Sequence, residues 1–145
     1  MKRFSFNLEK VLSLRKYREQ ETEIELGRTI GILSEIEHNI KSVVEERFRA
    51  GDQFSGNSAM IRSYMLYTAR LDQEKERLLV EAARAEQNVE AARLVYLEAS
   101  RDRKVLDKLK EKREKEYQKT ALAEETKMLD DLGSARYNRN SAELQ

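Results

Sequence analysis

The fold is decided by residues 61–106, which read IRSYMLYTARLDQEKERLLVEAARAEQNVEAARLVYLEASRDRKVL. Steps of alternately three and four residues through this stretch land mainly on apolar or small side chains. The positions are Ile61, Tyr64, Thr68, Leu71, Lys75, Leu78, Ala82, Ala85, Val89, Ala92, Tyr96, Ala99, Arg103 and Leu106. Such a heptad spacing is typical of a helix that packs along one seam. The stretch therefore predicts a long coiled-coil helix.

A second, weaker seam precedes this stretch. Its apolar positions are Leu8, Leu12, Leu26, Leu33, Ile36, Ile40 and Val43, and the interrupting residues are Arg15, Glu19, Thr22 and Thr29. The segment 51–58 between the two seams collects Gly51, Gly56 and four further turn-favouring residues. We therefore predict a first helix over about 8–50, a loop over 51–58 and a second helix over about 59–132.

Particular residues mark the expected helix ends. Ser5 or Asn7 is placed to cap the first helix and Gly51 to end it, while Asn57 or Ser58 can cap the second. Gly133 begins a polar tail, 133–145, that we expect to be disordered. These boundaries predict one all-α domain, residues 1–145, built as a long antiparallel two-helix coiled coil.

The composition favours this architecture over a compact globule. The chain has 145 residues, of which 38% are charged and 7% aromatic, with no Pro, Trp or Cys. Without proline nothing interrupts long helices, and a two-helix coiled coil needs only a narrow apolar seam. No apolar run reaches the length of a signal peptide or a membrane span, so a cytoplasmic location is expected.

A short loop predicts that residue 50 − k lies beside residue 58 + k. In this register Gly27 and Gly31 face the stretch that contains Ala82, Ala83 and Ala85. Small residues on both helices would let the two backbones approach closely, which is one interpretation of the glycines. The other is that the glycines mark a bend.

Charge is distributed unevenly although the net charge is only +1. Residues 1–20 carry a net charge of +4, and residues 101–119 also carry +4. Antiparallel folding brings these two segments to the same end of the hairpin. A field of one sign steers a partner of the opposite sign, so the chain termini form a candidate binding surface.

Residues that carry enzyme chemistry are missing from the sequence. There is no phosphate-binding glycine loop, no nucleophile with a base and no cluster of metal ligands, and His38 is the only histidine. We therefore expect a protein that is not an enzyme and that has no cofactor or metal. Four aromatic residues, Phe48, Phe54, Tyr64 and Tyr67, gather around the loop, where they form a docking patch unless Phe48 and Phe54 fold back to plug the end of the hairpin.

Two segments resemble the FliJ family of bacterial flagellar proteins. The opening FSFNLEKVLSLR, residues 4–15, is similar to the family's N-terminal signature, and RKVLDKLKEK, residues 103–112, followed by Glu125–Asp131, resembles its C-terminal helix. The resemblance implies a cytoplasmic, chaperone-like component of the flagellar type III protein export apparatus, and so a role in motility and chemotaxis. It also implies a fold like the gamma-subunit stalk of rotary ATP synthases.

Besides the export chaperones that members of the family recycle, the same resemblance implies two partners and a place at the cytoplasmic face of the inner membrane, reached through those partners. The first is the hexameric export ATPase, whose ring would receive the basic end. The residues expected at the ATPase are Lys10, Arg15, Arg18, Arg103, Lys104, Lys108, Lys110 and Arg113. The second partner is the cytoplasmic domain of the export-gate membrane protein. The residues expected at the gate are Asn39, Val43, Glu46, Tyr67, Leu71, Glu74 and Leu78.

Two alternatives remain open. The chain is also compatible with the stalk of a virulence type III secretion ATPase or of another rotary ATPase. A different class is a homodimeric coiled-coil scaffold, or a coil that uses its basic end to bind nucleic acid. The near-neutral total charge argues against a nucleic-acid partner.

Overall fold

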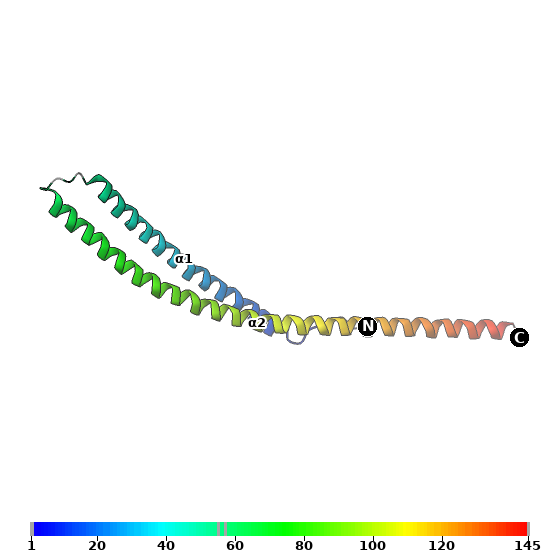
Figure 1. Cartoon of the computed structure of the whole chain (residues 1–145). Helices are drawn as coiled ribbons and strands as arrows, with labels where there is room; N and C mark the ends of the chain where they lie inside the picture. The colour runs from blue at the N-terminus through cyan, green and yellow to red at the C-terminus, as the bar shows by residue number, and fades with distance from the viewer. Residues whose placement is uncertain (1, 55, 57, 145) are drawn as a thin grey trace. The chain divides into compact units, whose positions relative to one another are not determined.

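A computed structural model describes residues 2–54, 56 and 58–144. It contains two helices, α1 (Glu9–Gln53) and α2 (Ile61–Glu143), and no strand within the described residues. From the loop, α2 runs back alongside α1 (Figure 1). The predicted all-α fold with two long helices packed against each other is confirmed.

Contacts group the chain into two units, each with its own packing. The loop unit comprises Tyr17–Ser100, and the terminal unit combines the residues up to Lys16 with those from Arg101 onward. The expectation that the whole chain is one domain stays a prediction.

The core of the loop unit is the predicted seam. On α2 the buried apolar residues are Leu71, Leu78, Ala82, Ala85 and Ala99. Thr68 and Thr29 are buried too, and each hydroxyl donates a hydrogen bond to the carbonyl oxygen three residues earlier, which satisfies the polar group within its own helix. The heptad pattern therefore identified correctly which face of α2 packs against α1.

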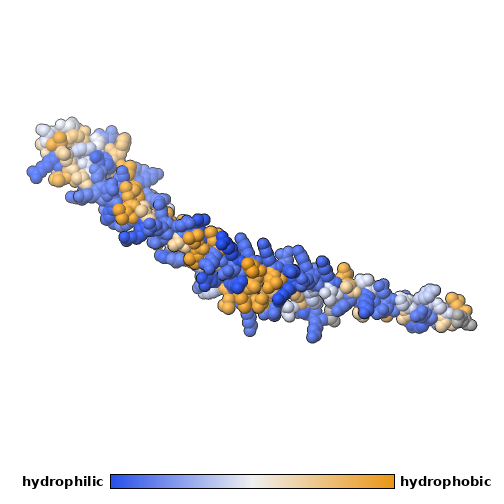
Figure 2. Space-filling model, turned by 60° about the horizontal axis from the view of Figure 1, so that its bottom comes forward, coloured by the Kyte–Doolittle hydropathy of each residue, from blue (hydrophilic) through white to orange (hydrophobic). Residues whose placement is uncertain are grey.

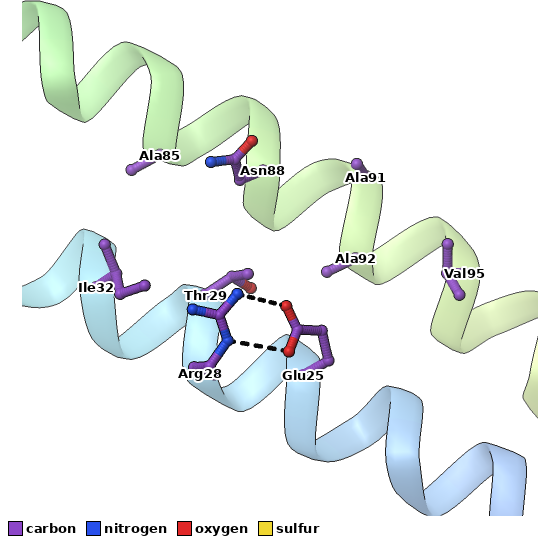
Figure 3. A pocket seen from close by; sticks show the side chains of 9 residues that line it. All are labelled: Glu25, Arg28, Thr29, Ile32, Ala85, Asn88, Ala91, Ala92 and Val95. Carbon is purple, nitrogen blue, oxygen red and sulfur yellow. Dashed lines mark hydrogen bonds and ion pairs between the residues drawn. The ribbon is translucent and has the colours of Figure 1, made fainter.

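The predicted register is wrong. It placed Thr29 beside Leu79, whereas Thr29 and Ile32 of α1 line a groove together with Ala85, Asn88 and Ala92 of α2 (Figure 3). The physical reason lies at the turn. The expected loop covered residues 51–58, but α1 continues to Gln53 and α2 begins only at Ile61. The chain therefore reverses its direction a few residues later than expected, which shifts the pairing of the two helices.

The interpretation of Gly27 and Gly31 as a place of close backbone approach is wrong, whereas the alternative, a bend at these glycines, stays a prediction. A Cβ atom built on Gly27 or on Gly31 meets no heavy atom within 4 Å, so these positions do not bring the two backbones together. The helix is continuous through both residues. The space around them is free for a larger side chain.

We expect the substitutions Gly27→Ala and Gly31→Ala to stabilise the protein by about 0.5–1 kcal/mol each, because alanine loses less backbone entropy than glycine in a helix. Thermal unfolding followed by circular dichroism measures the effect. Gly56→Ala is the opposite control, since Gly56 has φ of 75° and a side chain there is strained. A fall in stability for either helical substitution would contradict the prediction.

Several predicted helix ends differ from the structure. Gly51 does not end α1, because the only described glycine with positive φ is Gly56, inside the loop. Gly133 does not end α2 either, and residues 133–143 are helical rather than disordered. One glycine lowers helix propensity by only about 1 kcal/mol, which the surrounding helix-forming residues offset. Asn57, one of the two expected caps of α2, lies outside the described residues.

Candidate functional site

The terminal unit is built around a non-helical segment, residues 2–8, which we call the N-terminal strap. It lies before α1 and contributes Phe4, Phe6 and Leu8 to a small core. Phe6 is buried with Leu12 of α1 and Leu106 of α2, and Leu109 packs beside them. Apolar burial therefore holds the start of the chain against α2.

Polar and aromatic contacts fix the strap at its two ends. The side-chain oxygen of Asn7 accepts a hydrogen bond from Arg113, whose guanidinium also lies 5.7 Å from the centre of the Phe6 ring. Tyr117 donates a hydrogen bond to the carbonyl oxygen of Lys2, and its ring centre lies 5.5 Å from that of Phe4. The predicted capping role of Asn7 is wrong: α1 begins at Glu9, and the Asn7 side chain binds α2.

Half of the expected ATPase-binding cations are engaged within the terminal unit. Lys110 forms an ion pair with Glu9, with 2.9 Å between Nζ and Oε2, and its hydrogen bond to that carboxylate raises the pKa of Lys110. Arg15 donates a 2.8 Å hydrogen bond to the carbonyl oxygen of Asp102. Arg103 pairs with Asp107 at 2.6 Å, and Arg113 holds the strap as described above. These four cations stabilise the unit.

The other expected cations face solvent. Lys10, Lys104 and Lys108 are exposed in the terminal unit and form no hydrogen bond or ion pair with any residue that the structure describes. Arg18 is also exposed, and it belongs to the loop unit rather than to the terminal unit. Within the terminal unit, therefore, three of the expected residues retain a free charge for a partner.

The residues expected at the export gate all lie in the loop unit, but they do not share one environment. Leu71 and Leu78 are buried in the seam and Val43 is half-buried. Tyr67 donates a hydrogen bond to the carboxylate of Glu46, which raises the pKa of Tyr67, and Glu74 binds Arg77 of its own helix. Asn39 is exposed. The most apolar members of the set thus hold the helices together.

The loop end contains a polar cluster that the sequence analysis missed. Arg47 of α1 forms an ion pair with Asp72 of α2, with 3.2 Å between Nε and Oδ1, and donates a 3.4 Å hydrogen bond to the hydroxyl of Tyr64. A Cβ atom on Gly51 would lie 3.4 Å from the same hydroxyl. The sequence feature that could have predicted this cluster is Arg47 itself, which continues the seam of α1 four residues after Val43. A charged side chain at a seam position needs a partner on the facing helix.

The aromatic residues near the loop divide between the two expected roles. Phe54 stacks on Tyr64, with ring centres 4.4 Å apart, and closes the end of the hairpin. Phe48 instead remains 75% exposed and lines a shallow groove with Val44, Arg47 and Gly51. Apolar side chains gather at the loop end in Figure 2, on the left. Phe48 is thus the most exposed of the four aromatic residues near the loop.

Two further kinds of site, for a metal ion and for a membrane span, are absent from the described part of the chain. Within the described residues no group of three or more His, Cys, Asp or Glu side chains is arranged to hold a metal ion. Neither helix, over the same residues, has a stretch that is both long and apolar enough to cross a bilayer. His38 is exposed on α1.

Two long antiparallel helices that carry exposed basic and apolar surfaces define a helical-hairpin protein. The family model described as "Flagellar FliJ protein" matches residues 4–142. The chain therefore belongs to the FliJ family, which confirms the resemblance, and it is a component of the flagellar export apparatus. A search of curated proteins and a search of solved structures each gave no significant match.

Proposed function

We propose that this chain binds the hexameric ATPase of flagellar protein export through the basic surface of its terminal unit. The proposal extends the family assignment, which gives a component of the flagellar export apparatus, to a particular partner and surface. The observation that carries it is the set Lys10, Lys104 and Lys108, whose charges are exposed and unpaired in the described part of the chain. A surface of free positive charge attracts a complementary acidic surface and speeds its association.

The four engaged cations support this proposal indirectly. Arg15, Arg103, Lys110 and Arg113 hold the strap, α1 and α2 together, so the exposed lysines are presented on an ordered support. Preorganisation of this kind lowers the entropy that binding must overcome. In this proposal the free lysines contact the ATPase, and the engaged cations act by maintaining the structure.

The loop end is the proposed contact with the export gate. Its support is the exposed Phe48, because aromatic side chains are enriched at the centres of protein interfaces. Binding at both ends would bridge the ATPase to the gate, promote assembly of the ATPase and aid delivery of substrates or chaperones. A cytoplasmic location, with association at the membrane through these partners, belongs to the same proposal.

Charge reversal tests the ATPase contact. We expect the double variant Lys104→Glu/Lys108→Glu to weaken binding to the purified export ATPase by at least about tenfold, because it places like charges against an acidic surface. Stimulation of ATP hydrolysis should fall in parallel. The matched control is Lys41→Glu/Arg62→Glu, which makes the same charge change at exposed positions of the loop unit.

Circular dichroism of both variants confirms that the helices remain folded. Unchanged binding and stimulation by the folded Lys104/Lys108 variant would refute the proposed contact. Equal losses in both variants would refute it as well, because net charge and not this surface would then be responsible. Preference for the ATPase of a virulence secretion system over the flagellar enzyme would favour that alternative.

A further inference from the structure

A row of basic residues follows one side of α2 in the terminal unit, over residues 101–119, where the ribbon of Figure 1 passes from yellow into orange. The row steps by three or four residues, which keeps its members on one face of a helix. Its members are Arg101, Lys104, Lys108, Lys112, Lys115 and Lys119. We call it the lysine row. At about 1.5 Å per residue it extends for about 27 Å.

The lysine row lies on the outer side of α2. All six of its residues are exposed, whereas Leu106, Arg113 and Tyr117 on the other side of the helix contact the strap. Lys115 forms an ion pair with Glu111. The other five cations have no hydrogen bond or ion pair with any described residue. The acidic neighbours on α2 therefore leave most of the row unneutralised.

The lysine row extends beyond the two lysines of the proposed ATPase contact, and the row as a whole lacks the apolar centre that a protein interface of this length has. Cores of protein interfaces are depleted in lysine and contain aromatic or aliphatic anchors. Along residues 101–119 the exposed large apolar side chain is Val105, with no exposed aromatic residue beside it. The lysine ammonium is a compact, strongly hydrated charge, and it binds an anionic group as a point charge without the bidentate geometry of arginine. This pattern is typical of diffuse electrostatic binding.

The shape of the row selects among anionic surfaces. A straight row contacts a flat surface along its whole length, whereas the phosphates of a nucleic-acid duplex curve away from it beyond the first contacts. A bilayer that contains anionic lipids presents a flat negative surface, and basic residues close to it each contribute to binding. We propose that the lysine row binds the anionic surface of a lipid bilayer directly, with α2 of the terminal unit lying along the headgroups.

This inference goes beyond the proposed function, in which membrane association depends on protein partners. Lys104 and Lys108 belong both to the lysine row and to the proposed ATPase contact. A chain whose row lies on a bilayer cannot offer these two lysines to the ATPase at the same time. Anionic lipid and the ATPase therefore compete for the terminal unit.

The test uses the purified full chain and vesicles, with no ATPase present. Vesicles that contain phosphatidylglycerol are compared with vesicles of phosphatidylcholine alone, and bound protein is measured by co-sedimentation. We expect binding only to the anionic vesicles, with a steep decrease as salt is raised. The triple variant Arg101→Gln/Lys112→Gln/Lys119→Gln should bind about 100-fold more weakly, since each basic residue contributes about fivefold.

A matched control removes the same charge elsewhere. Lys41→Gln/Arg62→Gln/Lys127→Gln changes three exposed cations that lie off the row, and it should bind anionic vesicles like the unmodified chain. The triple variant of the row spares every residue assigned to the ATPase, so ATPase binding should persist in it. Loss of vesicle binding in the row variant supports the inference whether or not the chain binds the ATPase, and retained ATPase binding by the same variant separates the two surfaces.

Three outcomes would overturn the inference. The first is no binding of the unmodified chain to anionic vesicles. The second is equal binding by the row variant and its control. The third is binding of duplex DNA, but not of vesicles, that is lost in the row variant, which would assign the row to nucleic acid.

Discussion

Replacement of Leu12 by alanine should lower the free energy of unfolding by about 2–4 kcal/mol. Leu12 is 1% exposed, the most buried large side chain described, and it packs with Phe6 and Leu106 in the core of the terminal unit. Removal of its side chain leaves a cavity that the few neighbouring apolar groups cannot fill. The strap should then detach from α2, because this core is its main apolar support. Chemical denaturation measures the loss, and hydrogen exchange at residues 2–16 localises it.

Leu14→Ala is the matched control for Leu12→Ala. It makes the same substitution two residues further along α1 at a position that is 68% exposed. We expect a change within about 0.5 kcal/mol. Equal effects of the two substitutions would show that the strap core does not contribute to stability as the structure indicates.

The substitution Leu78→Asp should separate the two helices of the loop unit. Leu78 is 4% exposed in the seam, so an aspartate at this position would place an ionised carboxylate among apolar side chains without a cation to pair with. A buried unpaired charge costs about 3–5 kcal/mol, a large part of the total stability of a small protein. The expected result is a marked fall in the thermal midpoint with partial loss of helix content.

The neighbouring substitution Leu79→Asp controls for helix propensity. Leu79 is 42% exposed, so aspartate remains solvated there while the intrinsic cost to the helix is the same. A similar thermal midpoint for the two variants would contradict the assigned seam. The comparison also affects how a gate-binding experiment is interpreted. The family resemblance places Leu78 at the export gate, but Leu78 is buried in the seam. Loss of gate binding in Leu78→Asp would therefore indicate unfolding rather than the loss of a direct contact.

The sequence was sufficient to predict the packed face of α2 and the class of fold. Leu71, Leu78, Ala82, Ala85 and Ala99 are seam positions by spacing alone, and all are buried. A periodic pattern works here because burial repeats with the helix over many turns. The point at which the chain reverses occurs only once in the sequence, so no repeating pattern defines it. The predicted register of the two helices was wrong for that reason.

The role of the opening segment could not be predicted from helix periodicity. Phe4, Phe6 and Leu8 alternate with polar residues, a two-residue period that favours an extended segment with one apolar side. Helix periodicity does not detect this alternation, because its period is two residues and not three to four. Which cations are free could not be predicted either, because Asn7 and the carbonyl oxygen of Asp102 are partners that only the folded chain brings close.

The last part of α2 has a consequence for the energetics of recognition. Every described residue from Leu122 to Leu144 is exposed, so backbone hydrogen bonds and local propensity alone maintain that helix. Its helical population should therefore respond to temperature and solvent more than that of the covered turns. Leu122, Met128, Leu129 and Leu132 are all exposed along it. A protein that binds this segment must shift it fully into the helical state, which costs conformational entropy. The size of that entropy cost determines how strongly the binding affinity depends on temperature and solvent.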